Sequence, residues 1–469
     1  MDPETQAIRR NPLPNSLRVL LLNPPAPKTI QRDHYCSLST KADSYWPPID
    51  LVMQSGILSL EHQVSVLDAV VEQSPADDVL REVIRRQPQV VVALSSVLTA
   101  KDDLAFLDKV KKATGARIVL MGDIYYFRPE LMIQAGAVDA ICLQQATPAL
   151  LDYLAGDDAP EDMVCKAKNG DIHFGKKLKG PLKIPEPRQE LFLLDKYRFP
   201  MSRHKLFAPV LTMTGCPKQC SYCPVSSVDY RPRSIESVLA ELSSLSALGI
   251  KEILLMDLMF NADSKRAKQL CKSVIDSGLK LSWTTLLRPE KLDPELVTLL
   301  KEAGCHTVLC GVETVDPEIL KKNRRELDLG ELSKSFDMLH QAGLKSLAFV
   351  ILGLPGESWS SALQTIRFVC SLPCDYLSVN LFVPRCGSSY MKPYQTLDDV
   401  LEYQADMDST TTQTSHCSLS GLQLIWLKRW ALARFYLRPK LLWRHLRSLN
   451  SWNQLFNIVR IGPRLVFRD

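Results

Sequence analysis

Three cysteines within one short segment are the residues of this chain best suited to unusual chemistry. They lie in Cys216-Pro-Lys-Gln-Cys220-Ser-Tyr-Cys223, with the spacing C-x3-C-x2-C. Three thiolates spaced in this way can bind three irons of a [4Fe-4S] cubane, which leaves the fourth iron without a protein ligand. The sequence therefore predicts an iron-sulfur cluster with one iron open to another molecule.

A zinc site and a disulfide framework both fit these cysteines less well. A tetrahedral zinc site needs a fourth Cys or His, usually from a second pair, and no such pair is evident nearby in the sequence. The chain has 13 cysteines, an odd number, and no apolar signal segment at its start. This combination argues against disulfides and predicts a reduced, cytoplasmic protein.

The cysteine loop resembles the signature of the radical S-adenosylmethionine (SAM) superfamily, with an aromatic residue, Tyr222, before the last cysteine. The resemblance implies that Cys216, Cys220 and Cys223 are the cluster ligands, that Tyr222 belongs to the cofactor site, and that SAM binds the open iron. It also implies that SAM is cleaved reductively to a 5'-deoxyadenosyl radical. An electron donor such as flavodoxin or ferredoxin is then expected as a partner.

The elements around the loop alternate between predicted strands and helices. Strands are expected at 206–213, 252–256, 279–283, 307–309, 346–352 and 376–382, and helices at 235–247, 264–277, 294–303, 329–342 and 359–371. This pattern predicts the partial (β/α)6 barrel of the radical SAM superfamily. By analogy with full barrels, the active-site residues are expected at the carboxyl ends of its strands.

Five residues near those strand ends resemble the SAM-binding residues of the superfamily. Arg288 is similar to an arginine that pairs with the SAM carboxylate. Glu313 is similar to an acid that reaches the SAM ribose or amino group, and Gly353 and Gly356 to a glycine motif that meets the adenine. Asp257 is the single acid where many relatives have Gly-Gly-Glu, and it is the candidate for binding the SAM amino group.

Two further cysteines, Cys310 and Cys386, lie near predicted strand ends. Each is either a buried apolar residue or a catalytic residue that donates a hydrogen atom or a proton. Both are kept as candidate catalytic residues.

The first third of the chain also alternates strands with helices. Strands are expected at 17–22, 64–67, 90–94, 117–121 and 137–142, and helices at 50–60, 76–86, 100–114 and 129–135. Such alternation predicts a doubly wound parallel sheet. The motifs Asn23-Pro-Pro25, Tyr45-Trp-Pro-Pro48 and residues 60–69 resemble the cobalamin-binding domain that precedes many radical SAM domains.

The loops of this first domain depart from that resemblance. Tyr125, Tyr126, Gln144 and Gln145 stand where relatives have glycine or small residues, which allow a corrin to approach the backbone closely. We therefore expect cobalamin to bind weakly or not at all, and the domain to form one wall of the active site. Cobalamin binding is kept as the alternative.

The sequence divides into four predicted regions of an α/β protein. Residues 1–150 form the Rossmann-like domain, 151–205 a linker with a hairpin at Asn169-Gly170, 206–395 the barrel, and 396–469 a helical region. The last region is basic and aromatic. A helical cap over the barrel is favoured over an arm that binds a membrane surface or nucleic acid.

Composition and motifs together favour an enzyme. The chain is 46% hydrophobic and 23% charged, with a net charge of +5, values close to those of an ordinary globular protein. No apolar run reaches the roughly 18 residues of a membrane span, and nucleic acid is not expected as a partner. The favoured function is hydrogen abstraction from a small-molecule natural product or cofactor precursor, followed by cobalamin-independent dehydration or rearrangement.

Three alternatives to that function stay open. The first is a cobalamin-dependent radical C-methyltransferase of secondary metabolism. The second is an RNA-modifying radical SAM enzyme, which calls for an RNA-binding domain that the helical tail does not resemble. The third is a non-catalytic cluster protein, which the series of SAM-binding residues disfavours.

Overall fold

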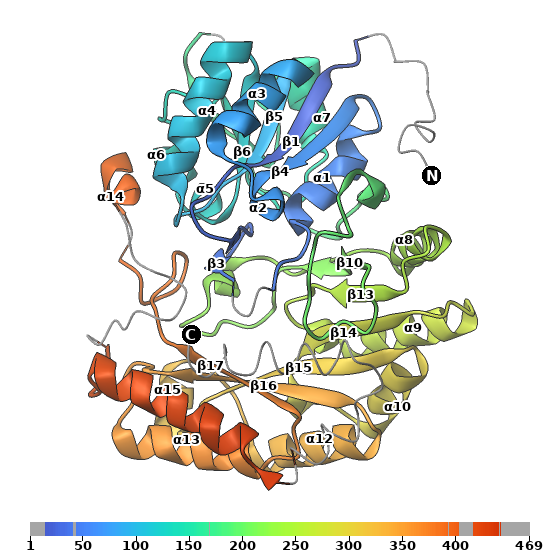
Figure 1. Ribbon diagram of the computed structural model, residues 1–469, viewed down its shortest axis with the longest axis vertical. Helices are drawn as coiled ribbons and strands as arrows, with labels where there is room; N and C mark the ends of the chain where they lie inside the picture. Colours follow the sequence, from blue (N-terminus) through green and yellow to red (C-terminus); the bar gives the residue numbers. More distant parts are fainter. Residues whose placement is uncertain are drawn as a thin grey trace.

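The computed structural model describes residues 15–40, 44–167, 169–392, 394–402, 416–439 and 441. Two α/β units lie one above the other in Figure 1, each built around a largely parallel sheet. The predicted α/β class, with a doubly wound sheet followed by a partial barrel, is confirmed. None of the described helices combines the length and the apolar character needed to cross a membrane.

The first unit contains a seven-stranded sheet in the order β4-β1-β5-β6-β7-β8-β9. The first five strands in this order run parallel to one another. β8 pairs antiparallel with β7, and β9 pairs antiparallel with β8. The strands are β1 (Arg18–Asn23), β4 (Gln63–Asp68), β5 (Val90–Leu94), β6 (Arg117–Met121), β7 (Ala140–Cys142), β8 (Met163–Lys166) and β9 (Ile172–Phe174). Wholly buried runs such as β5 are typical of parallel strands that helices cover on both faces.

The helices of this unit follow the predicted alternation. They are α1 (Ile49–Leu58), α2 (Ala69–Glu72), α3 (Ala76–Arg86), α4 (Ala100–Thr114), α5 (Asp123–Phe127), α6 (Pro129–Met132) and α7 (Ala149–Ala155). Two short strands, β2 (Ile30–Gln31) and β3 (Leu38–Ser39), form a separate hairpin after β1. The strand order changes direction between β1 and β5, so a ligand is expected near the carboxyl ends of these strands.

The hairpin at Asn169-Gly170 joins the first sheet. β8 pairs with β9 on either side of this turn, and β8 also pairs with β7. The first unit therefore continues to Phe174, beyond residue 150. The division of the chain into domains remains a proposal, in which this hairpin is assigned to the first unit.

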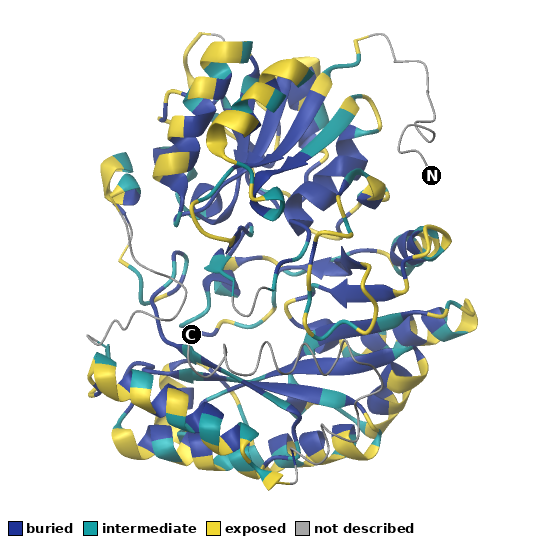
Figure 2. Cartoon of the chain, in the orientation of Figure 1, coloured by how far each residue is buried: buried dark blue, intermediate teal, exposed yellow. Residues whose placement is uncertain are grey.

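The second unit contains a six-stranded, fully parallel sheet in the order β10-β13-β14-β15-β16-β17. Its strands are β10 (Phe207–Val210), β13 (Glu252–Leu255), β14 (Ser282–Leu287), β15 (Cys305–Glu313), β16 (Lys345–Leu352) and β17 (Tyr376–Leu381). Its helices are α8 (Ile235–Ala247), α9 (Ser264–Asp276), α10 (Pro294–Glu302), α11 (Pro317–Lys322), α12 (Leu329–Gln341), α13 (Trp359–Ser371) and α15 (Gly421–Tyr436). The strands are buried, while the helices turn exposed faces outward (Figure 2).

Local sequence signals determine where these helices begin. The side chains of Ser234, Asp263, Asp293, Asp328 and Ser358 each accept a hydrogen bond from the first backbone N–H groups of the helix that follows. Such caps satisfy donors that have no partner within the helix. They place α8, α9, α10, α12 and α13 between successive barrel strands.

The chain returns to the first unit after β17. Val383, Cys386 and Val400 are buried in the apolar core of the first unit, and Val400 belongs to α14 (Leu397–Leu401). A Cβ on Gly387 would lie 2.2 Å from the Phe127 ring, so this segment packs tightly against α5. The two units are thus joined by a packed return segment as well as by the linker.

A buried ion pair fixes the carboxyl ends of β1 and β5. Arg32 lies 2.7 Å from Asp103, and both side chains are fully buried. Arg32 also donates to Asn23 at the end of β1, while Asp103 accepts hydrogen bonds from Ser95 and Thr99 after β5. This network joins the segments that follow β1 and β5 at the switch point of the first sheet through buried polar contacts.

Asp103→Ala is expected to lower the free energy of unfolding by about 3–5 kcal/mol, because it leaves the Arg32 guanidinium buried without a counter-charge. Asp108→Ala is the matched control, since it removes an exposed ion pair with Lys112 on the same helix and costs less than about 1 kcal/mol. Urea-unfolding midpoints of the three proteins give the comparison. Equal shifts in the two variants would contradict this role of the buried pair.

Candidate active site

A short antiparallel ladder holds the two ends of the cysteine loop. β11 (Met213–Thr214) leads into the loop, and β12 (Arg231–Pro232) leads out and pairs with it. Gly215, between β11 and the first cysteine, has a φ of +70°, and a Cβ there would lie 2.0 Å from the carbonyl oxygen of Asp229. Only glycine tolerates both conditions, so this residue fixes the turn before Cys216.

A buried carboxylate connects this ladder with the barrel. Asp257 follows β13, is fully buried, and accepts hydrogen bonds from the backbone N–H of Thr212 (2.7 Å) and of Met213 (3.2 Å) and from the Thr212 hydroxyl (2.5 Å). From the sequence, Asp257 is expected at the SAM amino group, whereas these contacts go to the chain that enters the cysteine loop. Asp257 is thus a positioning residue here, and its contact with SAM stays a prediction.

The three cysteines differ in exposure. Cys220 is buried, while Cys216 and Cys223 are partly exposed. Burial raises the pKa of the Cys216 and Cys223 thiols. Among the described residues, no three His, Cys, Asp or Glu side chains form a group that can hold a single metal ion. A cubane makes a different demand, because each thiolate binds its own iron.

The turn after α11 supports the outer side of the loop. The backbone N–H of Ser221 donates to the carbonyl oxygen of Asn323 (3.1 Å), and Lys218 forms an ion pair with Glu326 (3.2 Å). Tyr222 packs against an apolar cluster that contains Ile319, Leu354 and Phe382. The aromatic residue before the last cysteine therefore anchors the loop to the barrel.

Arg288 contacts the cysteine loop directly. One nitrogen of its guanidinium, Nη2, donates to the Cys220 sulfur (2.9 Å), and Nη1 lies 3.2 Å from a Glu290 oxygen. Glu290 also pairs with Arg325 at 3.2 Å, and the Asn261 amide exchanges two hydrogen bonds with the Arg288 backbone. Hydrogen bonds to cluster sulfurs are one way in which a protein tunes the reduction potential.

Glu313 ends β15 in an unusual backbone conformation. Its φ is +66°, and the pairing of β15 with β16 shifts register between Gly311 and Glu313. A bulge of this kind redirects a side chain, and such strained residues concentrate at functional sites. A Cβ on Gly311 would lie 2.6 Å from a Glu313 oxygen, so the glycine makes room for the acid. Burial raises the pKa of Glu313 to about 7, although Arg325 and Arg288 oppose this shift.

The predicted adenine motif forms a glycine turn after β16. Gly353 and Gly356 have φ values of +88° and +95°. The fully buried Glu357 accepts a hydrogen bond from the Gly353 N–H, while its second oxygen has no partner. Burial raises the pKa of Glu357 to about 8. The acid that shapes this turn was not assigned a role from the sequence, although it directly follows the second glycine.

An aromatic cluster from the first unit lies against the cysteine loop. Tyr35 and Tyr126 are buried together with Val225 and Val228, and Cys216 and Cys223 pack against them. The His34 ring lies 5.0 Å from Tyr35 and 5.3 Å from Tyr126, edge to face in both cases. Tyr126 follows β6, so the carboxyl end of the first sheet faces the cluster loop. The site therefore lies between the two units.

Several buried polar side chains of the loop after β1 and of α1 have no hydrogen-bond partner. They include both ring nitrogens of His34, both carboxylate oxygens of Asp50 and both amide atoms of Gln54. All three residues are fully buried. Burial and then the Asp33 carboxyl raise the pKa of Asp50, and burial lowers the pKa of His34 to about 3. Native proteins pair nearly all such groups with protein, water or a ligand, so these side chains are available to a polar ligand.

The bulky loop residues of the first unit do not all lie at this site. Tyr125 is fully buried in the apolar core of the first unit, among residues such as Leu107 and Met132. The Gln144 amide donates to Asp162 (3.3 Å) and to the Leu178 carbonyl (3.4 Å), near the hairpin and the linker. Of the four residues expected to obstruct cobalamin, only Tyr126 and Gln145 lie near the unpartnered polar groups, Tyr126 beside His34 and Gln145 beside Asp50.

The two candidate catalytic cysteines lie elsewhere. Cys310 is fully buried in the apolar core of the barrel. Cys386 is buried in the core of the first unit, and burial raises its pKa to about 12. Neither position supports a catalytic role, which stays an untested prediction.

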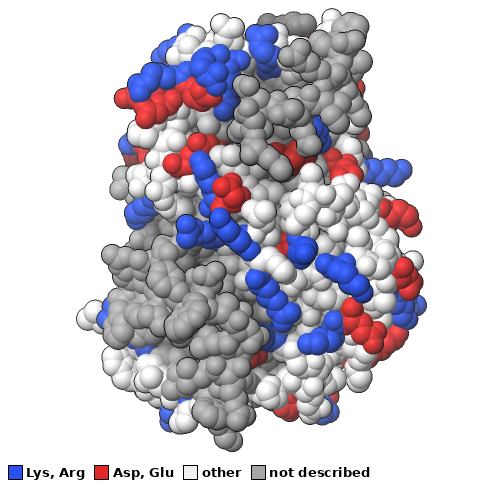
Figure 3. Space-filling view, turned by 45° about the vertical axis from the view of Figure 1, so that its right-hand side comes forward, with Lys and Arg blue, Asp and Glu red and all other residues white. Residues whose placement is uncertain are grey.

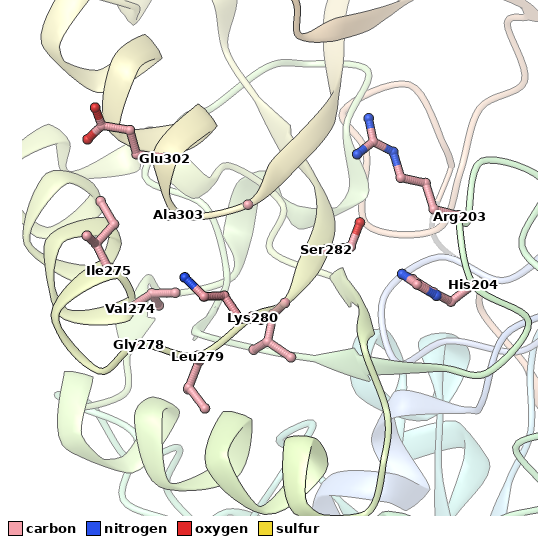
Figure 4. Close-up of a pocket in the computed structure, with 12 residues that line it drawn as sticks. Arg203, His204, Val274, Ile275, Gly278, Leu279, Lys280, Ser282, Glu302 and Ala303 are labelled. Atoms are coloured by element: carbon pink, nitrogen blue, oxygen red, sulfur yellow. The ribbon is translucent and has the colours of Figure 1, made fainter. Parts of the chain in front are cut away.

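A cavity of about 410 Å³ opens at the opposite end of the barrel. Figure 4 shows Arg203 and His204 on one side of it and Ile275 and Leu279 on the other. It also borders Ser282, the first residue of β14, and thus the amino end of the strand whose carboxyl end leads to Arg288. The cavity is therefore separate from the site of the cysteines.

A sequence profile described as the radical SAM superfamily matches residues 210–369, which include all three cysteines of the loop. The chain contains a radical SAM domain. Such a domain implies a [4Fe-4S] cluster and SAM as cofactors, as predicted from the sequence.

Similar proteins extend the comparison beyond the radical SAM domain. An uncharacterised methyltransferase of Pyrococcus horikoshii is 27% identical over 461 residues, which cover 91% of this chain and 94% of that protein. A tryptophan 2-C-methyltransferase of Streptomyces laurentii is 26% identical over 214 residues, 42% of this chain and 35% of that protein. The matched segment thus spans about a third of the second relative.

A solved structure has a similar fold. The radical SAM methyltransferase TsrM from Kitasatospora setae, with cobalamin and a [4Fe-4S] cluster bound, aligns with a TM-score of 0.62. The alignment covers 78% of this chain and 72% of that chain, at 18% sequence identity. At this identity the likeness concerns the fold alone.

The side chains present fit both cofactors of a radical SAM domain. Three thiols in one loop are available as ligands for the cluster. The β11–β12 ladder at the base of this loop is held by the hydrogen bonds of Asp257. Arg288, Glu313 and the glycine turn follow three consecutive strands, β14, β15 and β16, so they share one edge of the barrel sheet. Which of these residues touch SAM remains a prediction.

Replacement of Cys216, Cys220 or Cys223 by Ala is expected to abolish the cluster, because two thiolates then remain for the cubane. Iron and sulfide content and the thiolate-to-iron absorbance of anaerobically reconstituted protein measure the loss. Cys271→Ala is the control, since Cys271 is buried among apolar residues of the barrel and should leave the cluster intact. Full cluster content in any of the three loop variants would contradict the ligand assignment.

Proposed function

We propose that this chain is a cobalamin-dependent radical SAM methyltransferase that methylates a carbon atom of a small-molecule substrate. The observation that carries the proposal is a set of buried groups without a hydrogen-bond partner, on His34, Asp50 and Gln54. His34 packs against Tyr35 and Tyr126, which contact the cysteine loop. Asp50 lies at the start of α1, and Gln54 lies one turn further along the same helix face. These groups form a polar lining at the place where the switch point of the first sheet predicts a ligand.

The comparisons support methylation better than the cobalamin-independent dehydration or rearrangement that the sequence favours. The relative that aligns with nearly the whole chain carries the name of a methyltransferase, and TsrM was solved with cobalamin bound. When bound, the cluster supplies an electron, SAM supplies methyl and adenosyl groups, and cobalamin carries a methyl group.

The first unit is proposed to hold cobalamin with residues of the β1 loop and α1. His34, Asp50 and Gln54 offer donors and acceptors to the amide side chains of a corrin, and Gln145 lies close to Asp50. Tyr126 and Tyr35 form the aromatic boundary with the cluster loop. Tyr125 and Gln144, whose bulk argued against cobalamin, are engaged in other contacts.

The barrel residues are proposed to bind and orient SAM. Arg288 lies beside Cys220, so its positive charge is next to the loop where the SAM carboxylate is expected. Glu313 and the Gly353–Gly356 turn would hold the nucleoside. The aromatic cluster of the first unit packs against the loop and would shield a radical formed there from solvent.

Gln54→Leu tests the proposed cobalamin site. Because both amide atoms of Gln54 lack partners, an apolar side chain of similar shape should leave stability without cobalamin unchanged or improved. The same change should weaken the binding of hydroxocobalamin by roughly 5- to 150-fold, since the loss of hydrogen bonds to a buried amide costs on the order of 1–3 kcal/mol. Visible spectra and cobalt content after desalting give the retained fraction.

Gln144→Leu is the matched control, because its amide already donates to Asp162 and to the Leu178 carbonyl oxygen, whereas the Gln54 amide has no partner. The wild-type chain and this control should retain about one cobalamin per chain and form S-adenosylhomocysteine beside 5'-deoxyadenosine when SAM and reductant are added. A wild-type chain that retains no cobalamin and forms 5'-deoxyadenosine without S-adenosylhomocysteine would refute the proposal and support the cobalamin-independent reaction.

A further inference from the structure

Helix α15 presents apolar side chains on both of its faces. Its inner face packs on the barrel through residues that are all buried: Leu424, Leu427, Ala431, Leu432 and Phe435. Its outer face should be polar in an ordinary surface helix. Instead Leu422 is 82% exposed, Trp426 is 51% exposed, and Leu437, just past the helix end, is 69% exposed. The helix lies along the outside of the barrel (Figure 1).

Three tryptophans form a stacked row on this surface. The Trp426 ring lies 5.5 Å from Trp359 of α13 and 5.9 Å from Trp430, with interplanar angles of 24° and 9°. The Arg434 guanidinium lies 5.4 Å from the Trp430 ring. Trp359 and Trp426 are both exposed, so large aromatic surfaces face solvent side by side. A row of this kind exceeds the scattered exposed apolar residues of ordinary proteins.

The charge of this part of the chain is unusual as well. Residues 409–468 contain no Asp or Glu but ten Lys and Arg, and they hold four of the seven tryptophans. On the surface of α15, Arg429 and Arg434 are exposed beside the tryptophans. Elsewhere the signs are mixed: basic and acidic side chains are interspersed on the face shown in Figure 3. The apolar row thus coincides with a long acid-free stretch of the sequence.

We propose that the outer face of α15, with Leu422, Trp426, Trp430, Arg429 and Arg434, docks on the surface of an anionic lipid bilayer. Tryptophan is enriched at the boundary between headgroups and acyl chains, and aliphatic side chains enter it. Arginines on the same face are attracted to acidic headgroups. The proposed contact is a peripheral one, because it uses the exposed side chains of a helix whose other face packs on the barrel.

Nucleic acid fits this surface less well. A phosphate backbone pairs with cations and stacks bases on aromatic rings, but it offers no partner to Leu422 and Leu437, the most exposed side chains of the surface. A bilayer satisfies both the aliphatic and the basic side chains. Membrane docking through this face does not depend on methylation, because α15 packs on the outside of the barrel.

The experiment is vesicle flotation with the full chain carrying its reconstituted cluster. Vesicles of phosphatidylcholine are compared with vesicles that also contain phosphatidylglycerol. The chain should float with the anionic vesicles, with a bound fraction that falls as salt rises, since ions screen the arginines. Leu422→Ser/Trp426→Ser should weaken binding about tenfold or more, and Arg429→Glu/Arg434→Glu should abolish the preference for anionic lipid.

Leu60→Ser/Leu248→Ser is the matched control. These leucines are 57% and 52% exposed and lie at the ends of other helices, so their loss should leave flotation unchanged. Cluster content of each variant verifies that it is folded. Failure of the wild-type chain to float with anionic vesicles, or equal losses in the control, would overturn the proposal. Tighter binding of the wild-type chain to duplex DNA or RNA than to vesicles would overturn it in favour of nucleic acid.

Discussion

The buried carboxylate of Asp257 is the constraint on which the geometry of the site depends. It ties the end of β13 to the backbone of Thr212 and Met213, directly before the turn at Gly215. A cluster loop must offer three sulfurs in fixed positions. Three other parts of the chain hold this loop: Asp257 at its base, the turn after α11, and the aromatic cluster of the first unit. A flexible loop thereby gains a defined shape without regular secondary structure.

The site lies between the two units, so the side chains on both sides decide what chemistry it can perform. On the barrel side, Arg288, Glu290 and Arg325 form a largely buried charged group next to Cys220. On the other side lie unpartnered polar atoms of His34, Asp50 and Gln54 and the aromatic cluster around Tyr126. Unpaired polar groups are costly in a protein interior, and they are retained where a ligand pairs with them. The two walls therefore differ: one carries ion pairs, and the other carries an imidazole, a carboxyl and an amide without partners. This difference suits two different cofactors.

Much of the fold was predictable because it follows from local patterns. Apolar runs and capping residues located most strands and helices, the hairpin turn at Asn169-Gly170 was recognised, and the cysteine spacing identified the superfamily. β14 shows the largest shift from its predicted position: it begins at Ser282, three residues later than expected, and ends at Leu287, four residues later. α11 was missed because its six residues form too short a periodic pattern. The contacts of Asp257, Glu290 and Arg325 could not be predicted, because their partners lie far away in the sequence and only tertiary packing brings them together. The argument against cobalamin from bulky loop residues depends on tertiary packing in the same way. Tyr125 lies in the core of the first unit, and residue type alone does not reveal this.

The central claim is that Cys216, Cys220 and Cys223 bind three irons of the cluster and leave the fourth iron open to SAM. Electron–nuclear double resonance of the reduced, reconstituted chain measures the open iron most directly, with SAM that carries 17O in its carboxylate or 15N in its amino group. Hyperfine coupling of both nuclei to the cluster is predicted, as expected for direct ligation of the fourth iron. An intact reduced cluster with SAM bound to the protein but no coupling to either nucleus would contradict this assignment.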